Sequence, residues 1–241
     1  MCYMENIIAF SGGKDSTALA LRWAELGNSA RLLYTPTDRE LPEFFSHVEY
    51  AAKQTGFELI CIKAKKSLDE LIRQWNALPN PRQRWCTRML KIQPCIDWLK
   101  MNPGHRLLVG LRADEEERKG LYSDQIETVF PLREWCWGID EVLNFLDLHG
   151  VSIPERTDCD ICFFQRLPEW YRLWREFPDR FNEGVAYEDL TGHTFRSPSR
   201  DTWPADLRSL GEEFARGHKP RGADKQGELF SGLSKCRVCS L

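Results

Sequence analysis

The stretch FSGGKDST, residues 10–17, stands between an apolar run at 6–10 and the amphipathic segment ALALRWAELG that begins at Ala18. This order predicts a strand, a glycine-rich turn and a helix. Glycines let the backbone approach a ligand closely, and the first N–H groups of a helix lack partners within it. The helix dipole also attracts negative charge. The sequence therefore predicts an anion site in this turn, with a plain strand-to-helix connection as the alternative.

The turn differs from the two most familiar phosphate-binding loops. A Walker A element has glycine five places before its Gly-Lys pair and Ser or Thr directly after it, and these places hold Ile8 and Asp15. The dinucleotide fingerprint G-x-G-x-x-G is absent from the turn as well. A different class of phosphate site is therefore expected.

Composition excludes several classes of protein. The chain has 241 residues, 42% of them hydrophobic and 29% charged, which is typical of a globular protein. We find no apolar run long enough to span a membrane and no signal-peptide pattern, and we expect a cytoplasmic protein. A formal charge of −3 argues against a protein that coats nucleic acid, although 81–91 carries four basic residues and no acidic one.

The first 150 residues alternate short apolar runs with helical patterns. The predicted strands are Ile7–Phe10, Arg31–Thr35, Glu58–Lys63, Arg106–Gly110 and Ile126–Phe130. The predicted helices lie between them, one over Pro42–Thr55 and another opened by a capping box at Ser67–Glu70. This alternation predicts an α/β fold, a parallel sheet covered by helices on both faces, which binds ligands at the carboxyl ends of its strands.

After Gly150 the pattern changes to one without strands, rich in Trp, Arg, Phe and cysteine. We therefore predict two domains, an α/β domain over 1–150 and a helical, cysteine-bearing subdomain with a C-terminal tail over 151–241. The aromatic residues between 163 and 181 recur near helical spacing, which favours a core over a base-stacking surface. Pro168 suits the start of a helix over Leu167–Glu176.

The motif S-G-G-K-D-S after the first strand resembles the PP-loop of the ATP pyrophosphatase superfamily, also called adenine nucleotide alpha hydrolase-like. Further motifs narrow the resemblance to the phosphoadenosine phosphosulfate (PAPS) reductase family over roughly residues 5–150. They are TDRELPE at 37–43, RWCTRMLKIQP at 84–94, GLRADE at 110–115 and Pro131-Leu132 with Trp135. The chain also resembles the sulfur-transfer protein of DNA phosphorothioation. The resemblance implies an adenine nucleotide, ATP or PAPS, with Mg²⁺.

The resemblance also implies the residues of the site. Those expected to bind the nucleotide are Ser11, Gly12, Gly13, Lys14, Asp15, Ser16, Thr17, Asp38, Arg84, Arg88, Lys91 and Arg112. Arg112 follows a strand, where a guanidinium can clamp phosphate through paired hydrogen bonds. Arg88 and Lys91 lie one helical turn apart, which predicts one shared face. Asp114 and Glu115 either help hold Mg²⁺ or form an acidic helix start.

The nine cysteines point to metal or thiol chemistry, because the cytosol keeps structural thiols reduced. Two C-x-x-C pairs stand out, Cys159 with Cys162 and Cys236 with Cys239. Three alternatives stay open: an iron–sulfur cluster of the [4Fe-4S] type, Zn²⁺, and redox thiols without metal. For a cluster we expect Cys86, Cys159 and Cys162 as ligands, with Cys239 or Cys236 closing the site or delivering sulfur. We expect the remaining cysteines, at 2, 61, 95 and 136, to be small buried hydrophobes.

Three functions remain open. In the first, the chain cleaves ATP to AMP and pyrophosphate, adenylylates an acceptor and transfers sulfur, with Lys14, Cys86 and Cys239 as catalytic residues and nucleic acid as one acceptor. In the second it reduces PAPS to sulfite, although that family's usual Glu-Cys-Gly ending is replaced by Cys236-Arg-Val-Cys239. In the third it is a non-catalytic ATP-binding module. The expected partners are a sulfur donor or thiol reductant protein and a second copy of the chain in a homodimer.

Overall fold

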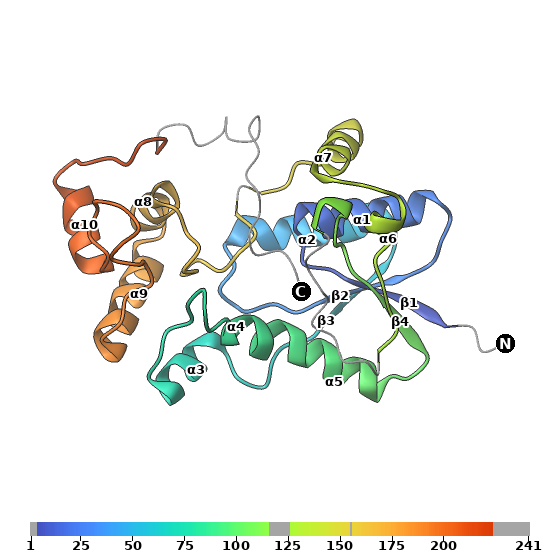
Figure 1. The fold of residues 1–241 in the computed structure, drawn as a ribbon, viewed down its shortest axis with the longest axis horizontal. Coiled ribbons are helices and arrows are strands. Elements are labelled where there is room, and N and C mark those ends of the chain that lie inside the picture. The colour runs from blue at the N-terminus through green and yellow to red at the C-terminus, as the bar shows by residue number, and fades with distance from the viewer. Residues whose placement is uncertain (1–3, 116–125, 155, 224–241) are drawn as a thin grey trace. The chain divides into compact units, whose positions relative to one another are not determined.

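The computed structural model describes residues 4–115, 126–154 and 156–223 (Figure 1). These residues form two compact units. The first unit lies within Met1–Lys65 and Thr87–Thr157, and the second lies within Lys66–Cys86 and Asp158–Val238. None of the helices in the described ranges is long and apolar enough to cross a membrane.

The first unit is built on a parallel sheet of five strands. The strands are β1 (Glu5–Ala9), β2 (Arg31–Tyr34), β3 (Glu58–Cys61), β4 (His105–Leu108) and β5 (Thr128–Val129). Their order across the sheet is β3-β2-β1-β4-β5, so β1 lies at the centre and pairs with both β2 and β4. Every predicted strand is present, with ends within two residues of the predicted ones. The predicted α/β fold class is confirmed.

Helices cover both faces of this sheet. They are α1 (Lys14–Glu25), α2 (Pro42–Thr55), η1 (Arg88–Ile92), α5 (Gln93–Met101), η2 (Ala113–Glu115), α6 (Pro131–Glu134) and α7 (Ile139–Leu148). Successive strand residues point to opposite faces, so Ile8 packs with Leu19 of α1 and Phe44 of α2. Its neighbour Ile7 packs on the other side with Leu99 of α5. Both isoleucines are fully buried, as a sheet covered on both faces requires.

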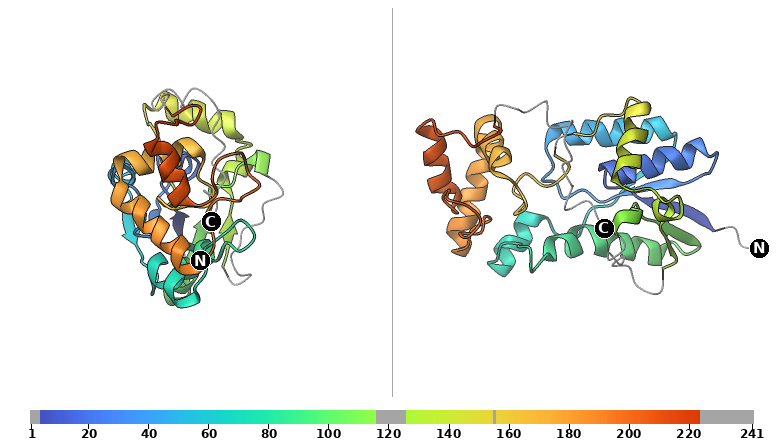
Figure 2. Two further views of the ribbon diagram at one scale, coloured as in Figure 1. Left: turned by 90° about the vertical axis from the view of Figure 1, so that its left-hand side faces the viewer. Right: turned by 45° about the horizontal axis from the view of Figure 1, so that its top comes forward.

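The second unit consists of helices and loops in its described residues. Its helices are α3 (Leu68–Trp75), α8 (Leu167–Glu176), α9 (Pro178–Thr191) and α10 (Leu207–Ala215), and the short α4 (Trp85–Thr87) runs across the boundary between the units. Figure 2 shows α8, α9 and α10 packed together in both views. The capping box at Ser67 and the helix start at Pro168 are as predicted.

Aromatic side chains form the core of the second unit, which confirms the prediction for residues 163–181. Trp170 is fully buried, and Tyr171 meets Phe214 of α10 edge to face at 5.1 Å between ring centroids. The carboxylate of Glu188 in α9 accepts hydrogen bonds from the backbone N–H groups of Phe195 (2.8 Å) and Leu207 (2.6 Å). Burial raises the pKa of Glu188 to about 7.

Candidate functional site

The glycine turn connects β1 to α1 at the carboxyl end of the central strand. Gly13 is the N-cap residue of α1 and has no side chain to bond the first helical N–H groups. The serines close the turn on itself: Ser16 Oγ donates to the Gly13 carbonyl oxygen (3.1 Å) and accepts from Ser11 N–H (3.2 Å). Helix α1 therefore begins with outward N–H groups that no N-cap side chain occupies, which is the arrangement that binds anions.

The charged residues of the turn are largely buried. Lys14 is 7% exposed, Asp15 is 3% exposed, and Lys14 Nζ lies 3.1 Å from Asp15 Oδ2. Thr17 is fully buried beneath the turn, and its Oγ1 has no hydrogen-bond partner in the described part of the chain. Ser11 is the most exposed residue of the motif. A ligand of this turn therefore meets mainly backbone N–H groups and Ser11.

Arg112, in the loop after β4, binds the first turn of α1. Its Nη1 lies 3.0 Å from each carboxylate oxygen of Asp15, and its Nε donates to Asp114 Oδ1 at 2.8 Å. Burial by itself lowers the pKa of Arg112, but the neighbouring carboxylates raise it, and the net result is above the ordinary value. The guanidinium therefore stays charged and clamps carboxylates in this structure, so a phosphate would compete with Asp15 for it.

The topology of the sheet explains why Arg112 reaches the turn. Strands β1 and β4 are neighbours, so the segments that follow them lie together at the point where the strand order reverses. The approach is close enough to favour glycine at position 110, since a Cβ there would lie 3.1 Å from the backbone carbon of Asp15 and from Ser16 N, a tight contact. Gly110 of the G-L-R motif thus lets the segment after β4 pass close to the glycine turn.

The sequence analysis missed two residues that hold this site together. Arg133 of α6 donates to the carbonyl oxygens of Arg112 (3.3 Å) and Glu115 (2.6 Å) and so fastens the loop that carries Arg112. His47 of α2 bonds the carbonyl oxygen of Gly12 through its Nε2 at 3.0 Å. A basic residue next to Pro131-Leu132 was the available signal for Arg133. For His47 we see no local sequence signal.

The loop after β2 places Asp38 at the same end of the sheet. The backbone N–H and hydroxyl of Thr37 donate to the buried carboxylate of Glu40, at 3.0 and 2.8 Å to Oε1, which fixes the loop. Asp38 adopts a left-handed backbone conformation (φ +60°) and is exposed. Its carboxylate pairs with Lys63 after β3 at 2.8 Å.

The basic segment 82–91 is divided between the two units. Arg88 and Lys91 belong to the first unit and lie on the π-helix η1, where Arg88 is exposed and Lys91 half-buried. The prediction of one shared face assumed α-helical spacing, whereas these two residues lie on a π-helix, so the shared face stays a prediction. Arg84 belongs to the second unit and lies over the ring of Phe164 at 5.7 Å. Its Nε and Nη2 are buried without a hydrogen-bond partner among the described residues.

Comparison with known proteins identifies the family of the chain. The protein-family model of the phosphoadenosine phosphosulfate reductase domain matches residues 5–155 of the sequence. The chain belongs to this family. The glycine turn, Asp38, Arg88, Lys91, Arg112 and Arg133 all fall inside the matched range, whereas Cys159 and Cys162 lie beyond it.

One solved structure supports the fold of this chain. The crystal structure of PAPS reductase from Candida auris, a phosphate complex, matches 63% of this chain and 75% of its own with a TM-score of 0.51 at 17% identity. A predicted tRNA methyltransferase subunit from Methanocaldococcus jannaschii matches 62% of this chain and 89% of its own, with a TM-score of 0.36 at 22% identity.

A curated relative extends over more of the chain. An uncharacterised protein of Methanocaldococcus jannaschii is 25% identical over 222 residues, which cover 84% of this chain and 53% of the relative. The chain therefore spans about half the length of this relative.

The pair Cys159–Cys162, beyond the family match, forms a turn anchored to the second unit. The Cys162 N–H donates to the Cys159 carbonyl oxygen at 3.2 Å. Between them, Asp160 is fully buried and pairs with Arg180 of α9 at 2.8 Å, and Ile161 is 1% exposed. The side-chain amide of Gln165 donates to the Asp160 carbonyl oxygen. The turn is thus held by its two middle residues and leaves both cysteines half-buried.

Cys86 belongs to the same unit and is also half-buried. The stacking of Arg84 on Phe164 brings its segment beside the Cys159–Cys162 turn. Within the ranges that the structure describes, however, no three His, Cys, Asp or Glu side chains gather as metal ligands. The predicted fourth cysteine, Cys239, lies outside the described residues, as does Cys236.

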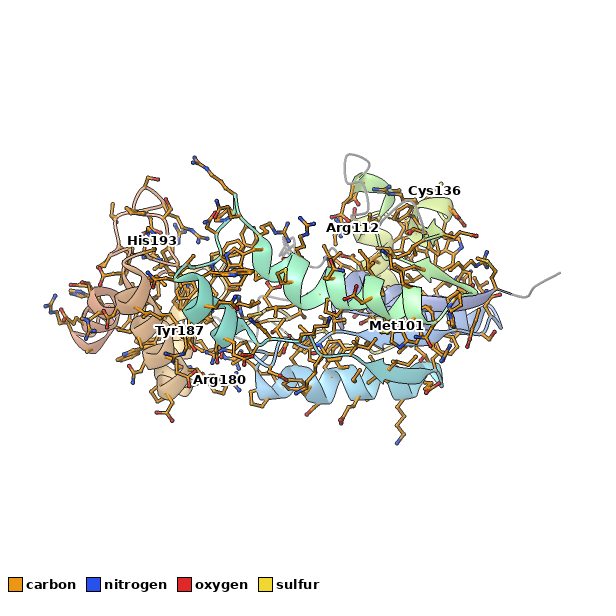
Figure 3. All side chains as sticks on the ribbon, turned by 90° about the horizontal axis from the view of Figure 1, so that it is seen from below. Met101, Arg112, Cys136, Arg180, Tyr187 and His193 are labelled. Atoms are coloured by element: carbon orange, nitrogen blue, oxygen red, sulfur yellow. The ribbon has the colours of Figure 1, made fainter. Side chains whose placement is uncertain are left out.

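The remaining cysteines divide into buried and exposed. Cys95 is 1% exposed, and burial raises the pKa of its thiol to about 12, so the prediction of a small buried hydrophobe is confirmed. The same prediction is wrong for Cys61 and Cys136, which are exposed. Cys61 ends the edge strand β3, which has one open side, and Cys136 follows the short α6 (Figure 3). Cys2 lies outside the described residues.

Proposed function

We propose that this chain binds ATP in the glycine turn and cleaves it between the α and β phosphates, passing the adenylyl group to an acceptor and releasing pyrophosphate. The observation that carries the proposal is the complete turn itself. It combines the outward N–H groups of α1 with a charged guanidinium, Arg112, held against the first helical turn by Asp15. Both features favour a group with several negative charges.

In the proposed reaction an acceptor oxygen attacks the α phosphorus and pyrophosphate leaves. The leaving group gains negative charge, which the helix N–H groups and Lys14 stabilise. Arg112 exchanges Asp15 for a phosphate oxygen, while Asp38, Arg88 and Lys91 supply further contacts to the nucleotide. Mg²⁺ would be held by the carboxylates of Asp114 and Glu115 together with phosphate oxygens, since this ion takes one or two carboxylates at such sites, and it would neutralise phosphate charge.

We further propose that the activated acceptor then receives sulfur through the cysteines of the second unit. A persulfide on one cysteine, supplied by a sulfur donor protein, attacks the acceptor carbon or phosphorus that carries the adenylylated oxygen, and AMP leaves with that oxygen. A second thiolate then cleaves the S–S bond, which leaves sulfur on the acceptor and a protein disulfide that a thiol reductant reduces. The anchored Cys159–Cys162 turn supports this proposal because two thiols two residues apart suit disulfide exchange.

The iron–sulfur cluster and zinc stay predictions. Three thiols in one unit have the soft donor chemistry that both groups prefer. Among the described residues, Cys86, Cys159 and Cys162 do not gather into a group of metal ligands. No step of the proposed reaction passes through a metal. Metal analysis of protein purified without oxygen tests them directly: iron with acid-labile sulfide supports the cluster, and stoichiometric zinc without iron excludes it.

Product analysis tests the proposed reaction. The full chain, purified without oxygen, is incubated with ATP and Mg²⁺ and with single-stranded DNA, duplex DNA or tRNA as acceptors. We expect AMP and pyrophosphate in equal amounts, lost in Lys14→Ala and retained in Lys53→Ala, whose lysine lies in the last turn of α2. Tight ATP binding without turnover would favour the binding module. Sulfite release from PAPS with thioredoxin would favour the reductase.

A further inference from the structure

The glycine turn rests on one face of α2, which the proposed function does not use. Phe44, His47 and Val48 follow helical spacing and are 1%, 7% and 2% exposed. A Cβ on Gly12 would lie 2.7 Å from Phe44 Cζ and 2.8 Å from Val48 Cγ2. Helix α2 therefore forms the floor of the turn and touches Gly12 directly.

His47 adds a polar contact to this apolar floor. Its Nε2 lies 3.0 Å from the carbonyl oxygen of Gly12. A carbonyl oxygen only accepts, so Nε2 must carry the proton and donate. Burial lowers the pKa of His47, against a smaller opposite effect of the Gly12 bond. The imidazole is therefore a fixed donor aimed at one backbone atom of the turn.

The orientation of one carbonyl decides the orientation of the next N–H. In a planar trans peptide the C=O and N–H bonds point in opposite directions. Because His47 holds the Gly12 carbonyl towards α2, the Gly13 N–H must point away from α2. Among the described residues, the Gly13 N–H donates only one long hydrogen bond, to Ser11 Oγ at 3.4 Å.

This peptide needs such a lock because it joins two glycines. Glycine accepts both signs of φ at little cost, so the Gly12–Gly13 peptide can rotate more easily than one between residues with side chains. In the rotated state the carbonyl oxygen would face the bound anion and repel it. Apparent affinity falls with the fraction of molecules in the binding-competent state.

We propose that His47 is a positioning residue that locks the Gly12–Gly13 peptide with its N–H directed at the phosphates. This inference rests on the proposed function, since it takes the turn as the polyphosphate site. His47 does not touch the nucleotide. His47 acts through the Gly12–Gly13 peptide group, and in this way it makes α2 a part of the binding site.

Calorimetric titration with inorganic pyrophosphate, ATP and AMP tests the lock in the full chain. His47→Leu keeps the volume and removes the donor, and we expect three- to tenfold weaker binding of pyrophosphate and ATP, about the value of one hydrogen bond. AMP lacks the β and γ phosphates, and its affinity is expected to stay unchanged. His47→Gln carries a side-chain N–H in a comparable place and is expected to restore affinity to within about twofold of the wild type.

Ala51→Gly is the matched control. Ala51 lies on the same buried face of α2, and glycine there destabilises the helix without touching the turn. If His47 acted only by supporting α2, then Ala51→Gly would weaken pyrophosphate binding as His47→Leu does, AMP binding would fall too, and His47→Gln would not rescue. Unchanged pyrophosphate affinity in His47→Leu would overturn the lock alone. Failure of the wild type to bind both pyrophosphate and ATP would overturn the proposed function together with it.

Discussion

Alanine at position 12 is expected to destabilise the first unit through two separable effects. Gly12 has φ +69°, and a residue with a Cβ pays about 1–2 kcal/mol in the left-handed region. The new methyl group would also meet Phe44 Cζ at 2.7 Å and Val48 Cγ2 at 2.8 Å. Both partners are buried, so they cannot move into solvent, and overpacking of this kind costs about 1–3 kcal/mol. The free energy of unfolding should therefore fall by about 2–5 kcal/mol.

Gly56→Ala separates the backbone effect from the steric one. Gly56 ends α2 with nearly the same φ (+71°), and a Cβ there meets no atom within 4 Å. Its substitution carries only the backbone cost of about 1–2 kcal/mol. The difference between the two variants, about 1–3 kcal/mol, is then the steric cost of crowding the floor of the glycine turn.

Urea titrations of the full chain, followed by circular dichroism, measure this difference. The transitions are fitted separately, because two units need not unfold together. Phe44→Leu, combined with Gly12→Ala, should recover part of the steric cost, whereas combined with Gly56→Ala it should recover none. Equal losses in the two single variants, or no coupling to Phe44, would refute the claim that α2 restricts position 12.

Three further predictions concern burial and charge. Arg112→Leu leaves Asp15 buried with Lys14 as its one remaining ion-pair partner among the described residues, so we expect the free energy of unfolding to fall by about 3 kcal/mol. Asp15→Asn in the same chain should restore most of this loss, and additive effects of the two substitutions would contradict the pairing. The pKa of Glu188 is raised to about 7 in the folded state, whereas in the unfolded state the carboxyl loses its proton near pH 4.5. The free energy of unfolding should therefore fall by up to about 3 kcal/mol as the pH rises from 4.5 to 7. Glu188→Gln should not show this fall. If the free energy of unfolding of the two proteins changed in parallel with pH, the raised pKa of Glu188 would not be its cause. Cys95, with a pKa of about 12, holds roughly a thousandfold less thiolate at neutral pH than an ordinary cysteine. Mass spectrometry after brief iodoacetamide treatment should therefore find the exposed Cys136 alkylated and Cys95 intact. Rapid labelling of Cys95 would contradict its burial.

Local patterns in the sequence determine the elements of the first unit and the place of its site. The alternation of apolar runs and amphipathic segments predicts five strands and their helices, because side-chain periodicity depends on neighbours in the chain. Pro42–Thr55 and the capping box at Ser67 appear with the predicted bounds and bonds for the same reason. The anion site of the glycine turn could also be predicted from the sequence, since two glycines directly before a helix favour anion binding whatever the surrounding fold.

Contacts between distant segments were decided only by the tertiary structure. The order β3-β2-β1-β4-β5 places β4 beside β1, and this brings Arg112 to Asp15, 97 residues earlier in the chain. The bond from His47 to Gly12 likewise depends on how α2 packs under the turn. Cys61 is exposed because its apolar strand lies at an edge, which residue type alone does not reveal. Sequence periodicity reports which face of an element is apolar, whereas the partner that covers that face is chosen by the packing of the whole unit.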